Sequence, residues 1–356
     1  MERYQRHEQL EGFGKPNQQK LTNAKVMVIG VGGLGCPVLM SLAGMGIGTL
    51  GLVDGDIVEK SNLHRQLLFT ESDIGKNKAL VAAHRLREMN ADISIHVFVE
   101  KVHPKNICDL IEEYDIVVDG TDHISIKYLI NDACVMLHKT LIYGAIFQYE
   151  GQVAVFNVME NGIYSCHYRD LFPHPEKNIN VASCNVVGVL GILPNIIGML
   201  MANEVVKILT GIGKPLVNQL LYYNIKNNDQ TIFRIEKNMD NTAVFTRSSI
   251  ESGQYDFSCF GDNSLTKQQL LDMFSDKNKS ILIDVRESFE SPNIKGFPFL
   301  NIPINKLEEQ KDILASFENI VFICQTGNRS LKAFEWAKQN LPEVGVFHFQ
   351  PGVRYL

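Results

Sequence analysis

A short apolar strand, a glycine-rich loop and the start of an apolar helix follow one another between residues 25 and 43. The loop fits the pattern G-x-G-x-x-G through Gly30, Gly32 and Gly35, with Gly33 between them. Glycines allow a backbone to approach a phosphate closely, and the helix N-terminus that follows offers unpaired N–H groups and a positive dipole end to the anion. This order of strand, loop and helix predicts the first half of a nucleotide-binding βαβ unit.

Acidic residues end two further apolar strands. The strand at residues 49–53 is followed by Asp54, and the strand that starts at Tyr114 ends in Asp119 and Asp122. The carboxyl ends of parallel strands meet at one edge of a doubly wound sheet, where ligands bind. We therefore expect Asp54 to accept the ribose hydroxyls of a nucleotide, with Asp119 and Asp122 at the same edge.

Strand and helix patterns alternate along most of the chain. They predict an α/β, Rossmann-like nucleotide-binding domain with a mostly parallel sheet at residues 1–235. The polar segment 236–253 is expected to be a linker. A second, small α/β domain is expected at residues 254–356, because two more apolar strands occur there, at residues 281–286 and 319–323.

Composition and charge narrow the class of protein. The chain is 45% apolar and 21% charged, as is typical of a globular enzyme, and its net charge of −6 argues against general nucleic-acid binding. Its seven cysteines form no disulfide framework and no secretory leader is recognised, so we expect reduced thiols in the cytoplasm. The apolar run at residues 186–206 contains Pro194, Asn195, Asn203 and Glu204, and we expect a buried helix near the sheet or a subunit interface, with no membrane span.

Arg65, Lys78 and Asp122 supply what adenylation of a carboxylate by ATP requires. A carboxylate is a weak nucleophile, and the α-phosphate repels its negative charge. Cations neutralise that charge, and a carboxylate that binds Mg²⁺ holds the pyrophosphate side. Taken singly, Arg65 and Lys78 are equally explained as surface cations and Asp122 as a turn former, but their joint placement at strand ends favours a site.

Several motifs in a fixed order resemble the MoeB/ThiF family, whose members adenylate sulfur-carrier proteins and are related to ubiquitin-activating enzymes. The matching segments, between residue 1 and about residue 235, are the glycine loop, the strand ending in Asp54, Ser61-Asn62-Leu63-His64-Arg65-Gln66, Gly75-x-x-Lys78 and Asp119-Gly-Thr-Asp122. The resemblance implies a homodimer that uses ATP and Mg²⁺. It also implies a ubiquitin-like sulfur-carrier partner whose C-terminal Gly-Gly enters the site.

The same resemblance assigns roles to individual residues. The implied roles are ribose binding by Asp54, phosphate binding by Asn62, Arg65 and Lys78, and Mg²⁺ binding by Asp122. Arg6 matches the arginine that reaches ATP from the other subunit. His123 follows Asp122 where relatives usually have asparagine, a change beside the expected metal ligand.

One feature of many relatives is missing from this sequence. They hold a structural zinc ion with two Cys-x-x-Cys pairs, but the positions of the first pair read His167-Tyr168-Arg169-Asp170 here. No cysteine occurs between Arg234 and Arg247, where the second pair is expected, and Cys166 with Cys184 cannot complete a four-cysteine site. We therefore expect no structural zinc.

A second resemblance lies near the C-terminus. The loop from Cys324 to Arg329 resembles the active loop of rhodanese, and residues 283–287 resemble an early strand of that domain. A loop of six residues from Cys to Arg aims backbone N–H groups at the sulfur, and Arg329 adds positive charge, so the thiol is expected to ionise and carry a persulfide. The usual Gly-His-Ile-x-Gly-Ala segment reads Pro292-Asn293-Ile294-Lys295-Gly296-Phe297 here. A buried structural cysteine is the alternative interpretation of Cys324.

Cys184 ends a stretch, residues 163–183, in which the hydrophobic pattern fails. We expect a mobile loop there and a helix over residues 185–209, which places the thiol near a helix N-terminus, where its pKa is lowered. In several relatives a cysteine at this loop position forms a covalent link to the carrier. A thioester or acyl disulfide between Cys184 and the carrier is therefore expected, with a passive buried thiol as the alternative.

Together these patterns predict an enzyme that adenylates a ubiquitin-like sulfur carrier and converts its C-terminal carboxylate to a thiocarboxylate. The sulfur is expected to come from a persulfide or thiosulfate donor through Cys324. Thiamine synthesis, molybdopterin synthesis and tRNA thiolation fit equally well as its pathway.

Two other classes of protein compete with this interpretation. An NAD-dependent oxidoreductase explains the glycine loop and Asp54 but not Arg65, Lys78 or the sulfur domain, and a catalytically degenerate carrier-binding scaffold keeps the motifs without turnover.

Overall fold

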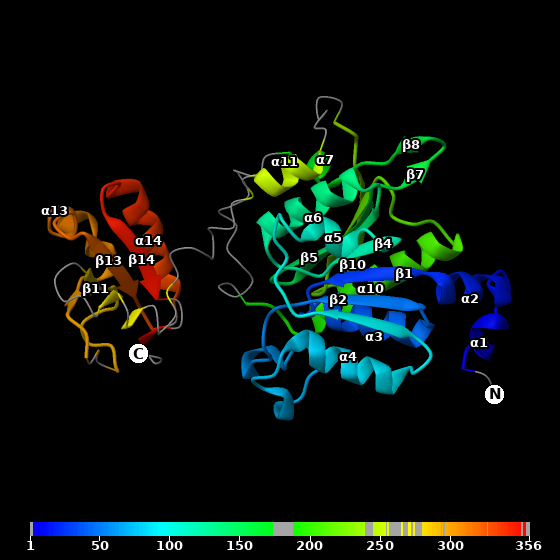
Figure 1. Ribbon diagram of the computed structural model, residues 1–356, viewed down its shortest axis with the longest axis horizontal. Helices are drawn as coiled ribbons and strands as arrows, with labels where there is room; N and C mark the ends of the chain where they lie inside the picture. Colours follow the sequence, from blue (N-terminus) through cyan, green and yellow to red (C-terminus); the bar gives the residue numbers. More distant parts are fainter. Residues whose placement is uncertain are drawn as a thin grey trace. The chain divides into compact units, whose positions relative to one another are not determined.

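The computed structural model divides the chain into two units, Met1–Tyr255 and Asp256–Leu356. Each unit contains a sheet of its own (Figure 1). The residues that the structure describes are 3–173, 188–238, 245–253, 255, 265, 270–271, 273–274, 280–292, 294, 296–325, 327–349 and 352–353.

An eight-stranded sheet forms the centre of the first unit, with the strand order β10-β9-β6-β5-β4-β1-β2-β3. Its strands are β1 (Lys25–Ile29), β2 (Thr49–Val53), β3 (Ser94–Phe98), β4 (Ile116–Asp119), β5 (Thr140–Phe147), β6 (Glu150–Phe156), β9 (Gln219–Asn224) and β10 (Asp229–Arg234). Strands β1 to β5 are parallel, whereas β6, β9 and β10 add to the sheet in antiparallel pairs. The predicted Rossmann-like, mostly parallel sheet is thus confirmed. A separate two-stranded hairpin pairs β7 (Met159–Glu160) with β8 (Ile163–Tyr164).

Helices cover both faces of this sheet (Figure 1). They are α1 (Gln5–Glu8), α2 (Gly14–Asn23), α3 (Gly35–Met45), α4 (Lys78–Met89), α5 (Ile107–Ile111), α6 (Ile124–Met136), α7 (Tyr168–Leu171), α10 (Ile192–Thr210) and α11 (Arg247–Ser252), with short 3₁₀ helices η1 (Lys60–Asn62) and η2 (Glu71–Asp73). Helices α3, α4 and α10 share one core with alternate residues of the strands, among them Val26 and Val28 of β1. Because β1 is buried on both faces, its sequence is an unbroken apolar run after Lys25.

Helix α10 passes the length and composition test for a membrane span, and no other helix in the described parts of the chain does. It packs against α2, α3, β5 and β6 in the first unit. The residues that it buries completely are Leu193, Ile197, Met201 and Val205. The core of the first unit therefore explains its apolar sequence, in agreement with the expected buried helix near the sheet.

The segment expected as a linker, residues 236–253, contributes helix α11 to the first unit. This helix packs against α6, and Ile250 on it is fully buried. Arg247 donates a hydrogen bond of 2.5 Å to Asp109, and the Tyr255 hydroxyl donates one of 2.7 Å to Asp132. The division between the units lies after Tyr255. Contacts such as these hold a segment of mostly polar sequence against the first unit.

A parallel four-stranded sheet in the order β12-β11-β13-β14 forms the second unit (Figure 1). Its elements are β11 (Ser280–Asp284), β12 (Phe299–Asn301), η4 (Ile304–Lys306), η5 (Glu308–Gln310), α13 (Lys311–Leu314), β13 (Asn319–Ile323), α14 (Asn328–Asn340) and β14 (Gly345–Phe349). Alternate residues of β13 enter two different cores, with Phe322 packed near Ala333 of α14 and Val321 near Phe349. The predicted small α/β domain is present, and its central strand β13 leads directly to Cys324.

Candidate functional site

Gly30 and Gly35 lie where the loop after β1 meets the loop after β4. Gly30 has a φ of 89°, a conformation that favours glycine. A Cβ atom on Gly30 would lie 3.0 Å from the Gly120 backbone, and one on Gly35 would lie 1.9 Å from the Gly30 carbonyl oxygen. Strand order reverses between β1 and β4, so this is the position at which doubly wound sheets bind ligands. Backbone packing alone requires these two glycines.

Gly32 has different surroundings. A Cβ atom there would meet only the Gln66 Nε2 atom, at an ordinary contact distance of 3.7 Å. Gln66 is 4% exposed, and its Oε1 atom has no hydrogen-bond partner among the described residues. A glycine that packing does not require, beside a buried polar atom without a partner, fits a ligand that approaches the backbone closely. The residues of this loop therefore fit a nucleotide.

The two kinds of glycine predict opposite effects of substitution. We expect Gly32→Ala to weaken binding of a nonhydrolysable ATP analogue about tenfold or more, because the methyl group occupies the ligand's space. Its thermal unfolding temperature should not change. Gly35→Ala should lower the unfolding temperature, since its methyl group meets a backbone oxygen that cannot move aside. Calorimetric titration and thermal unfolding of both variants measure this, and equal stability losses in both would contradict it.

Asp54 connects the end of β2 to the glycine loop. Its Oδ2 atom accepts a hydrogen bond of 2.8 Å from the Val31 N–H group, and its Oδ1 atom accepts one of 2.8 Å from the Asp56 N–H group. Burial raises the pKa of Asp54, while the Lys78 ammonium and the two N–H groups act to lower it. Each oxygen has a further lone pair that can accept a ribose hydroxyl.

Lys78 is the first residue of α4 and is only 8% exposed. The helix start is fixed by Asn77, whose side chain accepts a hydrogen bond of 3.1 Å from the Leu80 N–H group and donates one of 3.3 Å to the Asp54 carbonyl. The Lys78 ammonium lies 3.6 Å from a carboxylate oxygen of Asp56. The helix cap therefore places a largely buried positive charge beside the end of β2.

Asn62 and Arg65 come from η1 and the turn that follows it. Asn62 is buried, and its Oδ1 atom accepts a hydrogen bond of 3.1 Å from the Glu59 N–H group. The Arg65 guanidinium donates one of 2.9 Å to the Ser61 carbonyl, and its Cδ atom lies 3.7 Å from the position of a Cβ atom on Gly33. The structure thus brings Arg65 to the glycine loop.

Asp119 and Asp122, both expected at the edge of the sheet, have different surroundings. Asp119 is 1% exposed and accepts hydrogen bonds of 2.9 Å from the Lys127 ammonium and of 2.6 Å from the Thr121 hydroxyl. Lys127 is itself 5% exposed and donates a second bond of 2.9 Å to the Gly144 carbonyl. Asp119 therefore stabilises the fold. Asp122 is exposed, three residues further along the loop between β4 and α6, where a carboxylate can meet a ligand.

Arg6 lies on α1 and is exposed. Tyr4 fixes this segment to the first unit, because its hydroxyl accepts a hydrogen bond of 2.7 Å from the Asn90 amide and lies where a side chain on Gly46 would be. The arrangement leaves Arg6 accessible to another molecule.

Cys184 lies outside the described residues. Residues 185–187 lie outside the described residues as well. The expected single helix over residues 185–209 is wrong at residues 188–191, because α10 begins at Ile192. Before it, Gly188 has a φ of 82° and Val189 forms an isolated β-bridge with Gln148. Neither conformation is α-helical, so the expected helix is interrupted at these two positions, and the role of Cys184 stays a prediction.

His167 and Asp170, at the positions of the first expected cysteine pair, form contacts within the protein. The Asp170 carboxylate accepts hydrogen bonds of 2.8 Å from the His167 N–H group and of 3.0 Å from the Asn238 N–H group. Burial lowers the pKa of His167, which keeps its imidazole neutral at pH 7. In the described part of the chain, no group of three or more His, Cys, Asp or Glu side chains is placed to bind a metal ion. These residues do not fit a four-ligand zinc site.

Removal of metal ions should therefore leave the surroundings of His167 and Asp170 folded. We expect the purified protein to contain no stoichiometric zinc, and a chelator to leave its unfolding temperature unchanged. Asp170→Ala should cost about 1–3 kcal/mol, because it leaves two partly buried N–H groups without an acceptor. Asp170→Asn, which keeps one acceptor oxygen, should cost less. Elemental analysis and thermal unfolding test this, and one zinc per chain with a destabilising effect of the chelator would contradict it.

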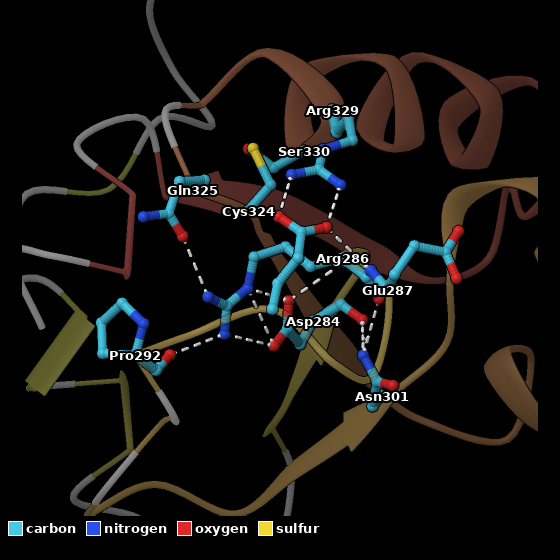
Figure 2. Close-up of polar contacts among 10 residues, drawn as sticks. Asp284, Arg286, Glu287, Pro292, Asn301, Cys324, Gln325, Arg329 and Ser330 are labelled. Atoms are coloured by element: carbon cyan, nitrogen blue, oxygen red, sulfur yellow. Dashed lines mark hydrogen bonds and ion pairs between the residues drawn. The ribbon is translucent and has the colours of Figure 1, made fainter.

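Cys324 follows β13 and is fully buried. Its Sγ atom lies 3.6 Å from the Ser330 hydroxyl, which donates a hydrogen bond of 2.9 Å to the Gly327 carbonyl (Figure 2). Gly327 has a φ of 87° and precedes α14, so the loop returns sharply from the strand to the helix N-terminus. The sulfur thus lies beneath a tight strand-to-helix loop. Complete burial is also what the alternative, a structural cysteine, requires, so the sulfur-carrying role of Cys324 stays a prediction.

A buried ion pair supports this loop from the neighbouring strand (Figure 2). Arg286 is 2% exposed, and its guanidinium donates a hydrogen bond of 2.8 Å to the Asp284 carboxylate. It donates further bonds of 3.0 Å each to the Gln325 side-chain oxygen and the Pro292 carbonyl. Arg286 therefore connects β11, the residue after Cys324 and the segment that follows β11.

Arg329 lies in the first turn of α14, and its guanidinium is paired with Glu290. Its Nη1 and Nη2 atoms donate hydrogen bonds of 2.5 and 2.7 Å to the two oxygens of the Glu290 carboxylate. This contact raises the pKa of Arg329 and lowers the pKa of Glu290 to about 2. Both groups are therefore charged at neutral pH.

The sheet, the glycine loop and the cations at its carboxyl edge define a Rossmann-like nucleotide-binding protein, joined to a second unit with a buried thiol loop. Comparison with known proteins agrees with this class. A model of the ThiF family matches residues 4–244. The chain belongs to the ThiF family.

The names of several relatives give an adenylyltransferase activity, a sulfurtransferase activity or both. A probable adenylyltransferase/sulfurtransferase MoeZ of Mycobacterium tuberculosis is 34% identical over 363 residues, covering 99% of this chain and 91% of that protein. A sulfur carrier protein adenylyltransferase of Thermus thermophilus is 45% identical over 226 residues, covering 63% and 83% respectively. A crystal structure of E. coli MccB with ATP is similar with a TM-score of 0.58 and 27% identity, covering 67% of this chain and 72% of that one.

Sequence reasoning did not single out three residues that the structure places beside the predicted sites. Gln66 was noted only as part of a motif, and its burial beside Gly32 emerges from the fold. Lys127 lies in a helix whose sequence gives no sign of a buried ion pair with Asp119. Glu290 lies 39 residues before Arg329, and no spacing pattern connects them.

Proposed function

We propose that the chain adenylates the C-terminal carboxylate of a ubiquitin-like sulfur-carrier protein ending in Gly-Gly, and then converts that carboxylate to a thiocarboxylate. One observation carries the proposal. A glycine loop in which packing does not require Gly32 and a thiol loop at Cys324 occur in two compact units of one chain. The names of the relatives from Mycobacterium tuberculosis and Thermus thermophilus support both activities.

In the first step a carboxylate oxygen of the carrier attacks the α-phosphorus of ATP. A new O–P bond forms, and the bond to pyrophosphate breaks. Asp54 accepts the ribose hydroxyls, while Asn62, Arg65 and Lys78 bind the phosphates. The largely buried Lys78 ammonium is best placed to offset developing charge, because charges interact more strongly away from water.

Asp122 is proposed to bind Mg²⁺ together with the phosphates. Mg²⁺ commonly binds through one or two carboxylates, substrate oxygens and water, so one exposed carboxylate is sufficient. When bound, the ion neutralises charge on the departing pyrophosphate. The MccB structure with ATP supports ATP as the nucleotide for this fold.

We further propose that the protein is a cytoplasmic homodimer in which Arg6 reaches the ATP of the other subunit. Arg6 is exposed on α1, and the outer face of α10 carries Ile192 and Met199, each 58% exposed. Exposed apolar side chains on one helix face are consistent with contact to a second subunit.

In the second step the terminal sulfur of a Cys324 persulfide attacks the acyl carbon of the adenylate. A C–S bond forms, and AMP leaves with the electron pair of the C–O bond, which gives an acyl disulfide between the carrier and Cys324. A second thiol, either Cys184 or a free thiol reductant, then attacks the Cys324 sulfur and forms a new disulfide with it, and the old S–S bond breaks with its electron pair leaving on the carrier thiocarboxylate. We propose that Cys184 also bonds to the carrier, as a thioester or an acyl disulfide. If Cys184→Ser still forms the same adduct and makes thiocarboxylate at the normal rate, sulfur passes directly from Cys324.

Carrier-dependent exchange of labelled pyrophosphate into ATP tests the proposal, with a panel of carriers ending in Gly-Gly from thiamine, molybdopterin and tRNA thiolation pathways. We expect exchange with one or more carriers and none with a carrier that lacks the last glycine. A scaffold without turnover gives no exchange with any carrier. An NAD-dependent oxidoreductase binds NAD in place of ATP, and either result would reject the proposal.

A further inference from the structure

The positive charge of the Cys324 loop is already neutralised within the protein. Arg329 is the only cationic residue among the six from Cys324 to Arg329, and both of its terminal nitrogens are bound to the Glu290 carboxylate. The nearby Arg286 is paired with Asp284 through its Nε and Nη2 atoms. These two ion pairs together carry no net charge.

The position of Glu290 is fixed by its own surroundings. Its Oε1 atom accepts a hydrogen bond of 3.0 Å from the Glu287 N–H group, and its own N–H group donates one of 3.1 Å to the Glu287 carbonyl. Two residues later, the Pro292 carbonyl is held by Arg286 (Figure 2). A carboxylate in such a supported turn forms a preorganised partner for Arg329, since a paired and supported side chain loses little further freedom.

The sulfur donors considered for this loop differ in charge. Thiosulfate is a dianion whose three oxygens need positive charge for binding, and sulfite must depart with a negative charge. A persulfide R–S–SH brings no such oxygens. In either case the Cys324 thiolate attacks the outer sulfur and forms a new S–S bond, while the old S–S bond breaks and its electron pair leaves with sulfite or with the thiolate R–S⁻.

We propose that Glu290 is a specificity-determining residue that holds Arg329 away from anionic donors and so makes the second unit selective for persulfides over thiosulfate. The inference rests on the proposed sulfur transfer through Cys324 and defines the class of donor. Glu290 acts through Arg329 and does not itself touch the reacting sulfur. Removal of the Glu290 carboxylate frees the Arg329 guanidinium to bind an oxyanion and leaves the attacking Cys324 thiol unchanged.

The test compares sulfur transfer from thiosulfate and from N-acetylcysteine persulfide by the full chain. Glu290→Gln should raise kcat/KM for thiosulfate about tenfold or more, mainly through a lower KM, because the freed guanidinium binds the dianion. The same variant should change kcat/KM for the persulfide by about twofold or less. Glu287→Gln removes the same charge from an exposed neighbour and should leave the ratio of the two donors unchanged.

Two further proteins separate the possible outcomes. In an Arg329→Gln background, Glu290→Gln should have no effect on either donor, because the group that it releases is absent. An unchanged donor ratio in Glu290→Gln, or equal losses with both donors, overturns the inference, since Glu290 would then be irrelevant or a general support. If neither donor labels Cys324 in the wild type and in Glu290→Gln, the proposed sulfur transfer itself fails. A Cys324→Ala control gives the level of labelling that does not depend on Cys324, and labelling of the wild type at that same level identifies this case.

Discussion

Replacement of Asp122 by alanine should abolish carrier-dependent pyrophosphate exchange, with a loss of about a thousandfold or more. The carboxylate is exposed on the loop between β4 and α6, so its removal takes away the proposed Mg²⁺ ligand without opening a cavity. The unfolding temperature should stay that of the wild type. Exchange and thermal unfolding measured on the same preparation test both parts of the prediction.

Asp119 provides the matched control. It also ends β4, but it is 1% exposed and bound to Lys127. Asp119→Ala should therefore lower the stability of the fold, since it leaves a buried ammonium without its partner. If Asp122→Ala exchanges pyrophosphate at the wild-type rate, Asp122 has no part in the mechanism.

The same variant tests the shared site. If Arg6 completes the ATP site of the other subunit, Arg6→Ala and Asp122→Ala proteins should each be inactive. Mixed heterodimers contain one site with both residues intact, so random reassortment should restore about a quarter of the wild-type rate. No recovery after heterodimers have been detected by mass spectrometry would show that each subunit works alone.

Replacement of Cys324 by alanine should remove sulfur transfer completely and leave adenylation unchanged. The two activities are expected to separate because the residues proposed for them lie in different units. Burial raises the pKa of the other cysteines that the structure describes, which are Cys36 (to about 12), Cys108, Cys134 and Cys166. Thiols with raised pKa values are poor nucleophiles at neutral pH, so none of these four replaces Cys324.

Intact-mass analysis after incubation with a persulfide donor measures the added sulfur, and pyrophosphate exchange measures adenylation. Cys166→Ala is the matched control, because it removes a buried thiol that the mechanism does not use, and it should retain both activities. Unchanged labelling of Cys324→Ala would assign the sulfur to another cysteine, either Cys184 or Cys259.

Local patterns were enough to predict the two folds, while the roles of the site residues stay predictions. The order of strand, glycine loop and helix from residue 25 to 43 has one stable arrangement in a parallel sheet, with its loop at the carboxyl edge. Asp54 and Lys78 follow directly from strand and helix ends, so their neighbourhood could be predicted. The break in the expected helix before α10 and the packing of residues 236–253 on the first unit could not, because Val189 and Ile250 act through contacts with distant parts of the chain.

By itself the sequence determined that this protein has a nucleotide-binding α/β unit, a second small α/β unit and a cysteine loop after its central strand. Each of these depends on hydrophobic periodicity and on glycines at fixed spacing, which are local properties. Only the tertiary structure decided which charges are available to a ligand. In the folded chain Asp119 is buried beside Lys127, Asp122 is exposed, and Arg329 is paired with Glu290. The sequence could not show this, because residues far apart in the chain set the charge and the burial of a site.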